Sequence, residues 1–223
     1  MGSSPNPKLD LLAAFAEVAR ALGNPHRLHL LETLAQGERS VDVLAGKTDI
    51  TIANASQHLQ ALRGAGLVEA RRAGKHIIYR VASDSVLELL GALRRTAEVQ
   101  LSAVQDLAEN YFKQRDSLEA VGFDDLMARL DDGVVTVIDV RPPDEFESGH
   151  LPRARNIPLS ELSARLAELP ASSPVVAYCR GPWCVLAFEA VALLRSKGYD
   201  ARRLDGGLPE WRLAGRQVLT GAH

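Results

Sequence analysis

The pattern of apolar residues changes near residues 114–120, and no other feature constrains the fold as strongly. Before this point, apolar residues recur with the spacing of amphipathic helices. After it, short continuous apolar runs alternate with helical segments. At 223 residues the chain is long enough for two small domains. We predict a mainly α domain over residues 1–100, a helical linker over 101–117, and an α/β domain with a mostly parallel sheet over 118–223.

The first domain is predicted to contain short helices followed by a β-hairpin. Ser40 and Thr51 are candidate helix caps, and Ala73-Gly74 is the expected hairpin turn. Residues 83–115 form one long helical pattern without proline, typical of a dimerisation or spacer helix, with Gly91 as a candidate break. The predicted helices cover residues 9–22, 26–34, 40–44, 52–62 and 83–115.

The second domain is predicted to alternate strands and helices. Strong strand signals cover residues 134–140 and 175–178, and a weaker one covers 201–204. The helical patterns lie at residues 123–130, 160–169, 185–197 and 208–214.

Composition excludes several classes of protein. No apolar run reaches the length of about 18 residues that a transmembrane helix needs. The N-terminus lacks the charged-then-apolar pattern of a signal peptide. Two cysteines do not make a disulfide framework in a chain of this size, which favours a reducing, cytoplasmic location.

A helix, a short turn, a second helix and a basic hairpin form the order of a winged helix-turn-helix domain, whose second helix enters the major groove. Ile52, Leu59 and Leu62 are expected to face the core. Between residues 63 and 80, five basic side chains stand against the single acid Glu69, which suits phosphate contacts, although the hairpin could simply be solvated. The candidate DNA-binding residues are Thr51, Asn54, Ser56, Gln57, His58, Arg63, Arg71, Arg72, Lys75 and His76.

Two stretches, GNPHRLHLLETL at residues 23–34 and SQHLQALRGAGLV at 56–68, resemble the ArsR/SmtB family of dimeric repressors. The resemblance covers residues 8–100. It implies a homodimer joined through its first and last helices that reads a palindromic operator. Many members sense metals through a Cys-Val-Cys pair on the third helix, where this chain has ERSVDVL at residues 38–44.

A second family metal site would begin at Asp84, but no histidine follows it through residue 115. We therefore expect this domain to hold no metal and the protein to need no cofactor. The histidines of the domain are expected to cap helices, pack or contact DNA; they are His26, His29, His58 and His76.

The second half carries its candidate chemistry at Cys179, where the apolar run 175–178 meets a helical segment. The N–H groups of the turn, the positive end of the helix and the adjacent Arg180 all favour thiolate over thiol. Asp139 and Arg141 end the first strand, at the sheet edge where α/β sites form. They are candidate catalytic residues, or an internal ion pair that pins the loops.

Three motifs in order resemble the rhodanese family: VIDVRPPDEFESGHLPRARNIP at residues 137–158, the loop that follows Cys179, and LDGGLPEW at 204–211. The resemblance covers residues 119–218. It implies that Cys179 carries sulfane sulfur as a persulfide, taken from thiosulfate or another persulfide and passed to a thiol or cyanide. In this family six-residue loops, such as 179–184 here, fit sulfur, and seven-residue loops fit phosphate or arsenate. Pro182 departs from the glycine common at its position and removes one N–H donor.

Cys184 is expected in the first turn of the following helix, five residues beyond Cys179. It is either a resolving thiol that attacks the persulfide, giving a disulfide and sulfide or a trisulfide-type bridge, or a small core residue. Trp183 is either a rim for the donor or a packing residue, and Trp211 is expected in the core. The candidate catalytic residues are Cys179, Arg180, Cys184, Asp139 and Arg141, and the candidate sulfur-binding loop is Gly181, Pro182 and Trp183.

These expectations describe a homodimeric DNA-binding repressor whose second domain senses or transfers sulfane sulfur through Cys179. Its expected partners are operator DNA, a small sulfur donor (thiosulfate, polysulfide or persulfide) and a second copy of the chain, with no membrane. Two alternatives stay open. One is a thiosulfate or persulfide sulfurtransferase with an accessory dimeric DNA-binding domain, and the other is a metalloid-responsive regulator that uses Cys179 and Cys184.

Overall fold

A computed structural model describes residues 6–113, 120–170 and 173–221. The chain forms two compact units, Met1–Leu89 and Leu90–His223. The boundary between them falls inside helix α5 (Asp84–Gln100), so one helix contributes residues to both units.

The first unit combines short helices with a small antiparallel sheet. Asparagine caps followed by proline start the first two helices: the Asn6 side chain accepts the N–H of Leu9, and that of Asn24 accepts the N–H groups of His26 and Arg27. The elements are α1 (Pro7–Leu22), α2 (Pro25–Leu34), β1 (Arg39–Ser40), α3 (Val41–Lys47), α4 (Ile52–Gly64), β2 (Val68–Ala73) and β3 (His76–Val81).

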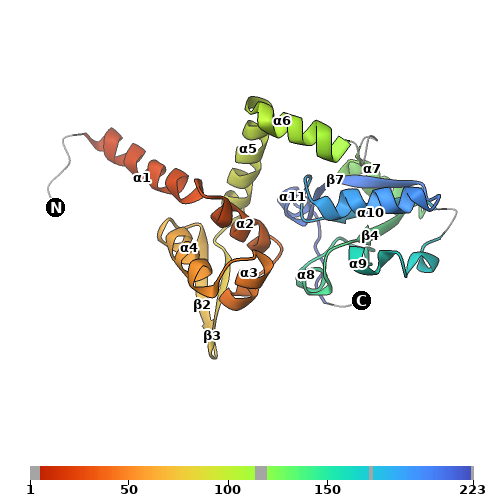
Figure 1. The fold of residues 1–223 in the computed structure, drawn as a ribbon, viewed down its shortest axis with the longest axis horizontal. Coiled ribbons are helices and arrows are strands. Elements are labelled where there is room, and N and C mark those ends of the chain that lie inside the picture. Colours follow the sequence, from red (N-terminus) through yellow and green to blue (C-terminus); the bar gives the residue numbers. More distant parts are fainter. Residues whose placement is uncertain (1–5, 114–119, 171–172, 222–223) are drawn as a thin grey trace. The chain divides into compact units, whose positions relative to one another are not determined.

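Helices α3 and α4 and the β2–β3 hairpin have the predicted winged helix-turn-helix order. Thr51 caps α4 by accepting the Asn54 N–H at 3.2 Å. Strand β3 lies between β1 and β2, and the tip of the hairpin projects beyond α3 and α4 (Figure 1). Ala73 pairs with His76, so the turn is formed by Gly74 and Lys75, one residue later than predicted; Gly74 takes a φ of 59° there.

The core of this unit includes the buried face of α4. Leu59 and Leu62 are fully buried, as predicted. The prediction for Ile52 was wrong, because its side chain is 57% exposed. The buried face of α4 is formed by Ala55, Leu59 and Leu62, and Ile52 lies at the N-terminal end of the helix, beyond the reach of these core contacts.

The prediction of one long helix over residues 83–115 was also wrong. Helix α5 ends at Gln100, Leu101 adopts an extended conformation (φ −110°, ψ 111°), and α6 (Ser102–Leu107) and a π-helix, η1 (Ala108–Lys113), follow. The Gln105 amide donates to the carbonyls of Glu98 and Val99, which satisfies acceptors left open at the end of α5. Gly91 lies within α5 and does not interrupt it. The end of the predicted helix and linker lies outside the described residues.

The second unit is built on a parallel sheet with strand order β5-β4-β6-β7, as the alternation of strands and helices predicted. Its elements are α7 (Phe123–Asp131), β4 (Thr136–Asp139), α8 (Pro143–Ser148), β5 (Arg155–Asn156), α9 (Leu159–Leu162), a 3₁₀ turn η2 (Leu166–Glu168), β6 (Val175–Cys179), α10 (Val185–Ser196), β7 (Ala201–Gly207) and α11 (Leu208–Leu213).

Both faces of this sheet are buried, which explains the continuous apolar runs in its strands. Alternate residues of β6 divide between two clusters. Val175, Ala177 and Cys179 pack with residues of α9 and α10, and Val176 and Tyr178 pack with residues of α7 and α11. Cys179 therefore points to the α10 side of the sheet.

Two details of the second unit differ from the sequence prediction. The helical pattern at residues 160–169 is divided between α9 and η2. Helix α8 and strand β5 were not predicted, and the two residues of β5, Arg155 and Asn156, carry no apolar pattern. In the described part of the chain, no helix is both long and apolar enough to cross a membrane.

Candidate functional site

Cys179 is the last residue of β6 and is fully buried. A register shift between Ala177 and Cys179 places Cys179 opposite Gly207 of β7. Cys184 was predicted in the first turn of α10, but it is the N-cap residue of this helix. The two cysteines form a disulfide with a Cα–Cα distance of 6.1 Å, so the loop between β6 and α10 is held in its oxidised form.

The backbone of this loop offers fewer donors than the sequence suggested. Pro182 has no N–H, and the Cys184 N–H donates to the Gly181 carbonyl at 3.1 Å. Besides Pro182, whose missing donor is evident from the sequence, the Cys184 N–H is thus removed from the predicted anion-binding nest. Arg180, Gly181 and Trp183 retain the N–H groups that could face an anionic sulfur.

Arg180 holds the loop to helix α8. Its guanidinium forms two hydrogen bonds with Glu145, both at 2.8 Å, and the Glu145 side chain is only 2% exposed. The prediction that the charge of Arg180 serves the Cys179 thiolate needs correction, because the buried Glu145 carboxylate shares this charge and requires such a partner.

Asp139 and Arg141 form a fully buried ion pair at the end of β4, with 2.5 Å between Asp139 Oδ2 and Arg141 Nη2. Arg141 also donates to the Gly149 carbonyl at 2.7 Å. Burial opposes the charge of Arg141, but the Asp139 carboxylate outweighs this effect and raises the pKa of Arg141. These contacts fit the loop-pinning interpretation of the pair, and a direct catalytic role stays a prediction.

Gly207 and Glu210 support the Cys179 loop from the other side. A Cβ atom at Gly207 would lie 2.5 Å from the Cys179 oxygen, the Arg180 carbonyl carbon and the Gly181 nitrogen. The Gly207 N–H donates to Glu210 Oε2 at 3.0 Å. Glycine at this position therefore allows β7 to approach the loop closely. Both residues lie in the motif LDGGLPEW, whose two adjacent glycines were the available sequence signal for a close approach of backbones.

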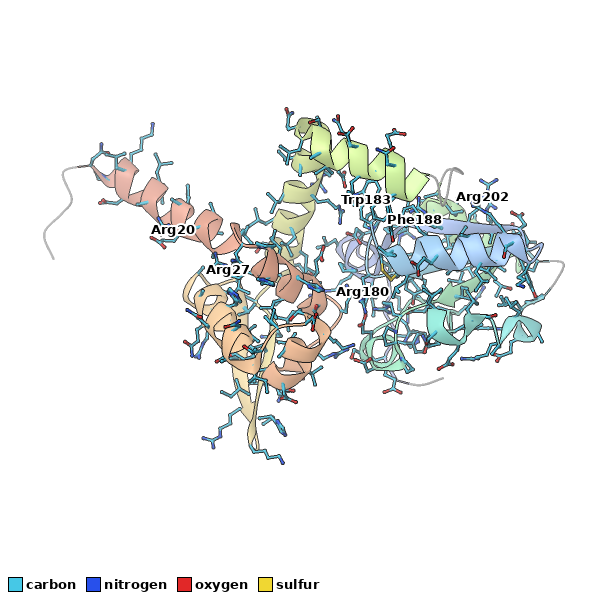
Figure 2. All side chains as sticks on the ribbon, in the orientation of Figure 1. Arg20, Arg27, Arg180, Trp183, Phe188 and Arg202 are labelled. Atoms are coloured by element: carbon cyan, nitrogen blue, oxygen red, sulfur yellow. A yellow bond between two sulfur atoms is a disulfide. The ribbon has the colours of Figure 1, made fainter. Side chains whose placement is uncertain are left out.

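Trp183 lies in an aromatic cluster beside the loop. Trp183 and Phe188 are labelled next to each other in Figure 2. The two rings are parallel, with 6.4 Å between their centroids, and the ring of Phe112 lies edge-on to that of Trp183 at 4.8 Å. The Trp183 indole N–H donates to the Glu98 carboxylate. Trp183 thus packs and hydrogen-bonds, while remaining partly exposed. Glu98 and Phe112 could not be predicted as neighbours of the loop, because they lie far from it along the chain.

The candidate DNA-reading helix α4 exposes part of its predicted set. Thr51, Asn54 and Gln57 are exposed, and Ser56 and His58 are half-buried. The His58 ring stacks on that of His26 at 5.7 Å. Burial, and then the positive charge of nearby Arg27 and of His26, lowers the pKa of His58. His58 is therefore neutral near pH 7 and is available as a hydrogen-bonding group, not as a cation.

Acidic residues neutralise part of the basic hairpin. Arg71 pairs with Glu38, and Arg80 pairs with Glu69 at 2.5 Å. His76 lies 3.6 Å from Asp42. The net charge of residues 63–80 did not include Glu38 and Asp42, because these acids lie elsewhere in the sequence and only the fold brings them to the hairpin. Among the residues that the structure describes, the exposed basic side chains of the predicted set that form no ion pair are Arg63, Arg72 and Lys75.

Comparison with known proteins assigns each half of the chain to a separate domain family. Residues 123–214 match the model of the Rhodanese-like domain, and residues 22–71 match that of a Helix-turn-helix domain. The HTH-type transcriptional regulator Rv0324 of Mycobacterium tuberculosis is 43% identical over 222 residues, which cover 100% of this chain and 97% of that protein.

Two further matches concern the first unit. The biofilm growth-associated repressor of Agrobacterium fabrum is 44% identical over 94 residues, covering 42% of this chain and 80% of the repressor. The solution structure of the homodimeric winged helix-turn-helix DNA-binding domain of Mb0332 from Mycobacterium bovis is 42% identical, with a TM-score of 0.42, covering 45% of this chain and 94% of that one. On the full-length match and the two domain models, the chain belongs to the family of HTH-type transcriptional regulators that join an ArsR-like winged helix to a C-terminal rhodanese-like domain.

Proposed function

We propose that this protein is a cytoplasmic, homodimeric transcriptional repressor whose rhodanese-like domain forms a persulfide on Cys179 and thereby senses sulfane sulfur. The observation that carries the proposal is the pairing of Cys179 with Cys184 across a loop between a strand and a helix. A thiol held within bonding distance of another thiol is well placed to resolve an oxidised or sulfur-loaded partner.

In the first step, the Cys179 thiolate attacks a sulfane sulfur of thiosulfate or of a polysulfide. A new S–S bond forms on Cys179 Sγ, and the S–S bond of the donor breaks, releasing sulfite from thiosulfate or a shorter polysulfide. In the second step, the Cys184 thiol loses its proton and attacks Cys179 Sγ. The persulfide bond breaks, HS⁻ leaves, and the Cys179–Cys184 disulfide remains, so two thiols are oxidised and one sulfur is reduced.

The reduced loop would favour the first step through its remaining N–H groups and the N-terminal end of α10, which follows Cys184 directly. Because Arg180 shares its charge with Glu145, these backbone dipoles contribute more to stabilising the Cys179 thiolate than they would beside an Arg180 without that carboxylate. Asp139 and Arg141 act as an ion pair that fixes the end of β4 beside β6, the strand that ends in Cys179.

DNA binding is assigned to α4 and to the hairpin. Asn54 and Gln57 present amides suited to adenine edges, and the exposed Ile52 offers an apolar contact suited to a thymine methyl group. Arg72 and Lys75 at the end of the hairpin suit phosphate contacts, which bring salt dependence. The assignment rests on exposure and chemistry of these side chains.

A second copy of the chain is proposed to pack against the exposed apolar side chains of α1. Leu9, Leu11, Leu12 and Phe15 are between 48% and 60% exposed. Four large apolar side chains on one helix form the kind of exposed patch that marks an interface. Pairing through the first helix would also supply the two-fold symmetry that a palindromic operator needs.

The test measures the affinity of reduced protein for a labelled duplex selected from a random-sequence pool, at fixed salt. It compares untreated and inorganic polysulfide-treated samples of the wild type, Cys179→Ser and Cys184→Ser, with mass spectrometry of each sample. We expect an affinity change that follows sulfur loading and is lost in Cys179→Ser. Cys184→Ser should accumulate the Cys179 persulfide, because the second step cannot occur.

Sulfur loading without any change of affinity would refute the sensing role. The rhodanese-like fold then favours the second candidate, a sulfurtransferase with an accessory DNA-binding dimer. That activity is measured as multiple-turnover formation of thiocyanate from thiosulfate and cyanide, and it should also disappear in Cys179→Ser.

A further inference from the structure

The Cys179 loop is contacted by side chains that lie outside the region matched by the rhodanese-like domain, which begins at residue 123. The Trp183 indole N–H donates to Glu98 of α5. Glu98 in turn lies 3.6 Å from Arg94, one helical turn earlier. All three residues belong to the unit Leu90–His223.

A second connection joins α5 to Glu210 and Gly207, which support the loop. Arg94 Nη1 donates to Glu210 Oε1 at 3.0 Å, and Glu210 Oε2 accepts the Gly207 N–H. Gly207 lies directly against the backbone of Cys179 and Gly181. The side chains of Arg94, Glu98 and Glu210 are between 26% and 30% exposed, so these ion pairs are partly shielded from solvent.

The aromatic cluster adds a third connection. Phe112 of η1 is 8% exposed, and its ring lies 4.8 Å from that of Trp183 and 4.7 Å from that of Phe188. Trp183 immediately precedes Cys184 in the chain. Trp183 therefore joins the residue next to Cys184 to both the indole hydrogen bond and the aromatic packing.

We propose that Glu98 and Arg94 of α5 are positioning residues for the Cys179 loop, and that they couple its sulfur state to helix α5. This inference rests on the proposed function for its biological meaning. A reduced pair, a persulfide and a disulfide require different Cys179–Cys184 separations, so each state sets a different position for Trp183. Because α5 begins at Asp84 in the other unit, a shift in its C-terminal half has a continuous helical connection to the DNA-binding unit. Coupling of this kind is reciprocal.

The test uses the full-length chain and two separate readouts. The first is the rate at which diamide, a thiol oxidant, closes the Cys179–Cys184 disulfide, measured by alkylation and mass spectrometry. The variants are Glu98→Ala, Glu98→Gln and Trp183→Phe, with Glu88→Ala as the matched control, because Glu88 is an exposed glutamate on the same helix. Circular dichroism confirms that each variant is folded.

We expect Glu98→Ala and Trp183→Phe to slow closure about tenfold, because a misplacement of a full 1 Å can cost about 100-fold and the loss of one contact should move the loop by less than that. Glu98→Gln, which keeps an acceptor oxygen for the indole, should recover most of the wild-type rate, and Glu88→Ala should match the wild type. If Glu98→Ala and Trp183→Phe both close within twofold of the wild type, the positioning role is overturned, whatever the DNA measurements give.

The second readout is duplex affinity before and after treatment with inorganic polysulfide. We expect Glu98→Ala to load Cys179 with sulfur and yet to lose the affinity response of the wild type. An unreduced response in fully loaded Glu98→Ala overturns the coupling to α5. If the wild type itself shows no response, the proposed sensing function fails, while the diamide rates still decide whether Glu98 positions the loop.

Discussion

Replacing Gly207 by alanine tests whether the close approach of β7 maintains the Cys179 loop. Gly207 has an extended backbone (φ −139°, ψ −162°) that any residue adopts, so backbone conformation does not require glycine there. The requirement is steric: the added Cβ would lie 2.5 Å from three backbone atoms of Cys179, Arg180 and Gly181, where ordinary contacts begin at 3.4 Å. The loop or the strand must therefore retreat by about 1 Å.

The expected losses of stability and of reaction rate follow from the steric overlap and from the displacement of the loop. Overpacking of a well-packed site costs about 1–3 kcal/mol, and we expect the upper half of this range because the opposing atoms belong to backbone and not to flexible side chains. A displacement of about 1 Å between reacting groups slows a reaction about 100-fold. Gly207→Ala should therefore lower the free energy of unfolding by about 2–3 kcal/mol and slow disulfide closure and sulfur loading by up to about 100-fold.

The assay follows urea unfolding by tryptophan fluorescence, because both tryptophans of the chain, Trp183 and Trp211, belong to the unit that contains the loop. Closure of the disulfide by diamide is timed on the same samples after reduction. Gly122→Ala is the matched control: no atom lies within 4 Å of its added Cβ, and its φ is −70°. Because Gly122 is the N-cap residue of α7, where alanine is less favourable than glycine, we expect the control to lose at most about 1 kcal/mol and to close its disulfide at the wild-type rate. The reasoning is refuted if Gly207→Ala unfolds within about 0.5 kcal/mol of Gly122→Ala and closes its disulfide at the same rate.

Three further predictions concern the first unit. Phe15→Glu should raise the dimer dissociation constant by at least about 100-fold, because each of two copies loses about 1.5 kcal/mol or more of apolar burial; sedimentation velocity measures this, and an unchanged dimer would remove α1 from the interface. Lys75→Ala should weaken binding to all duplexes alike and reduce the salt slope by about 1. Arg71→Ala should do less, since Glu38 already pairs with Arg71; equal slopes for the two variants would contradict this. His58→Gln should remove a loss of stability that the wild type shows as the pH falls below about 6.5, because the lowered pKa of His58 means that the unfolded chain takes up the proton first. Melting followed by circular dichroism between neutral and mildly acidic pH checks it, and parallel curves for the two proteins would exclude His58 as the cause.

Much of the fold could be predicted from the sequence because it rests on local signals. The apolar runs before Asp139 and Cys179 identify the two central strands, since parallel strands covered on both faces are apolar throughout. Thr51 identifies the start of α4, because its hydroxyl satisfies a free N–H group there. These features depend on residues that are neighbours in the sequence.

The wrong predictions have physical causes that cannot be recognised from a local sequence pattern. The break at Leu101 depends on Gln105 reaching back to the end of α5, and a proline-free helical pattern does not reveal such a competitor. Strand β5 is two residues long and forms only because β4 offers it a free edge. Ile52 has the spacing of a core residue but lies at the end of its helix, where the core no longer reaches.

Both candidate sites show the same limit in the prediction of charge. Arg180 and Arg71 were each interpreted from their nearest sequence neighbours, and each is paired with a glutamate at least 33 positions away. A buried carboxylate such as Glu145 must find a cation, because leaving it unpaired would cost several kcal/mol, about 3–5 in typical cases. A surface pair such as Arg71 with Glu38 contributes little to stability, yet it still removes a positive charge from the field that a phosphate would meet. The net field at either site is therefore set by the fold, and at the Cys179 loop the charge of Arg180 is shared with Glu145.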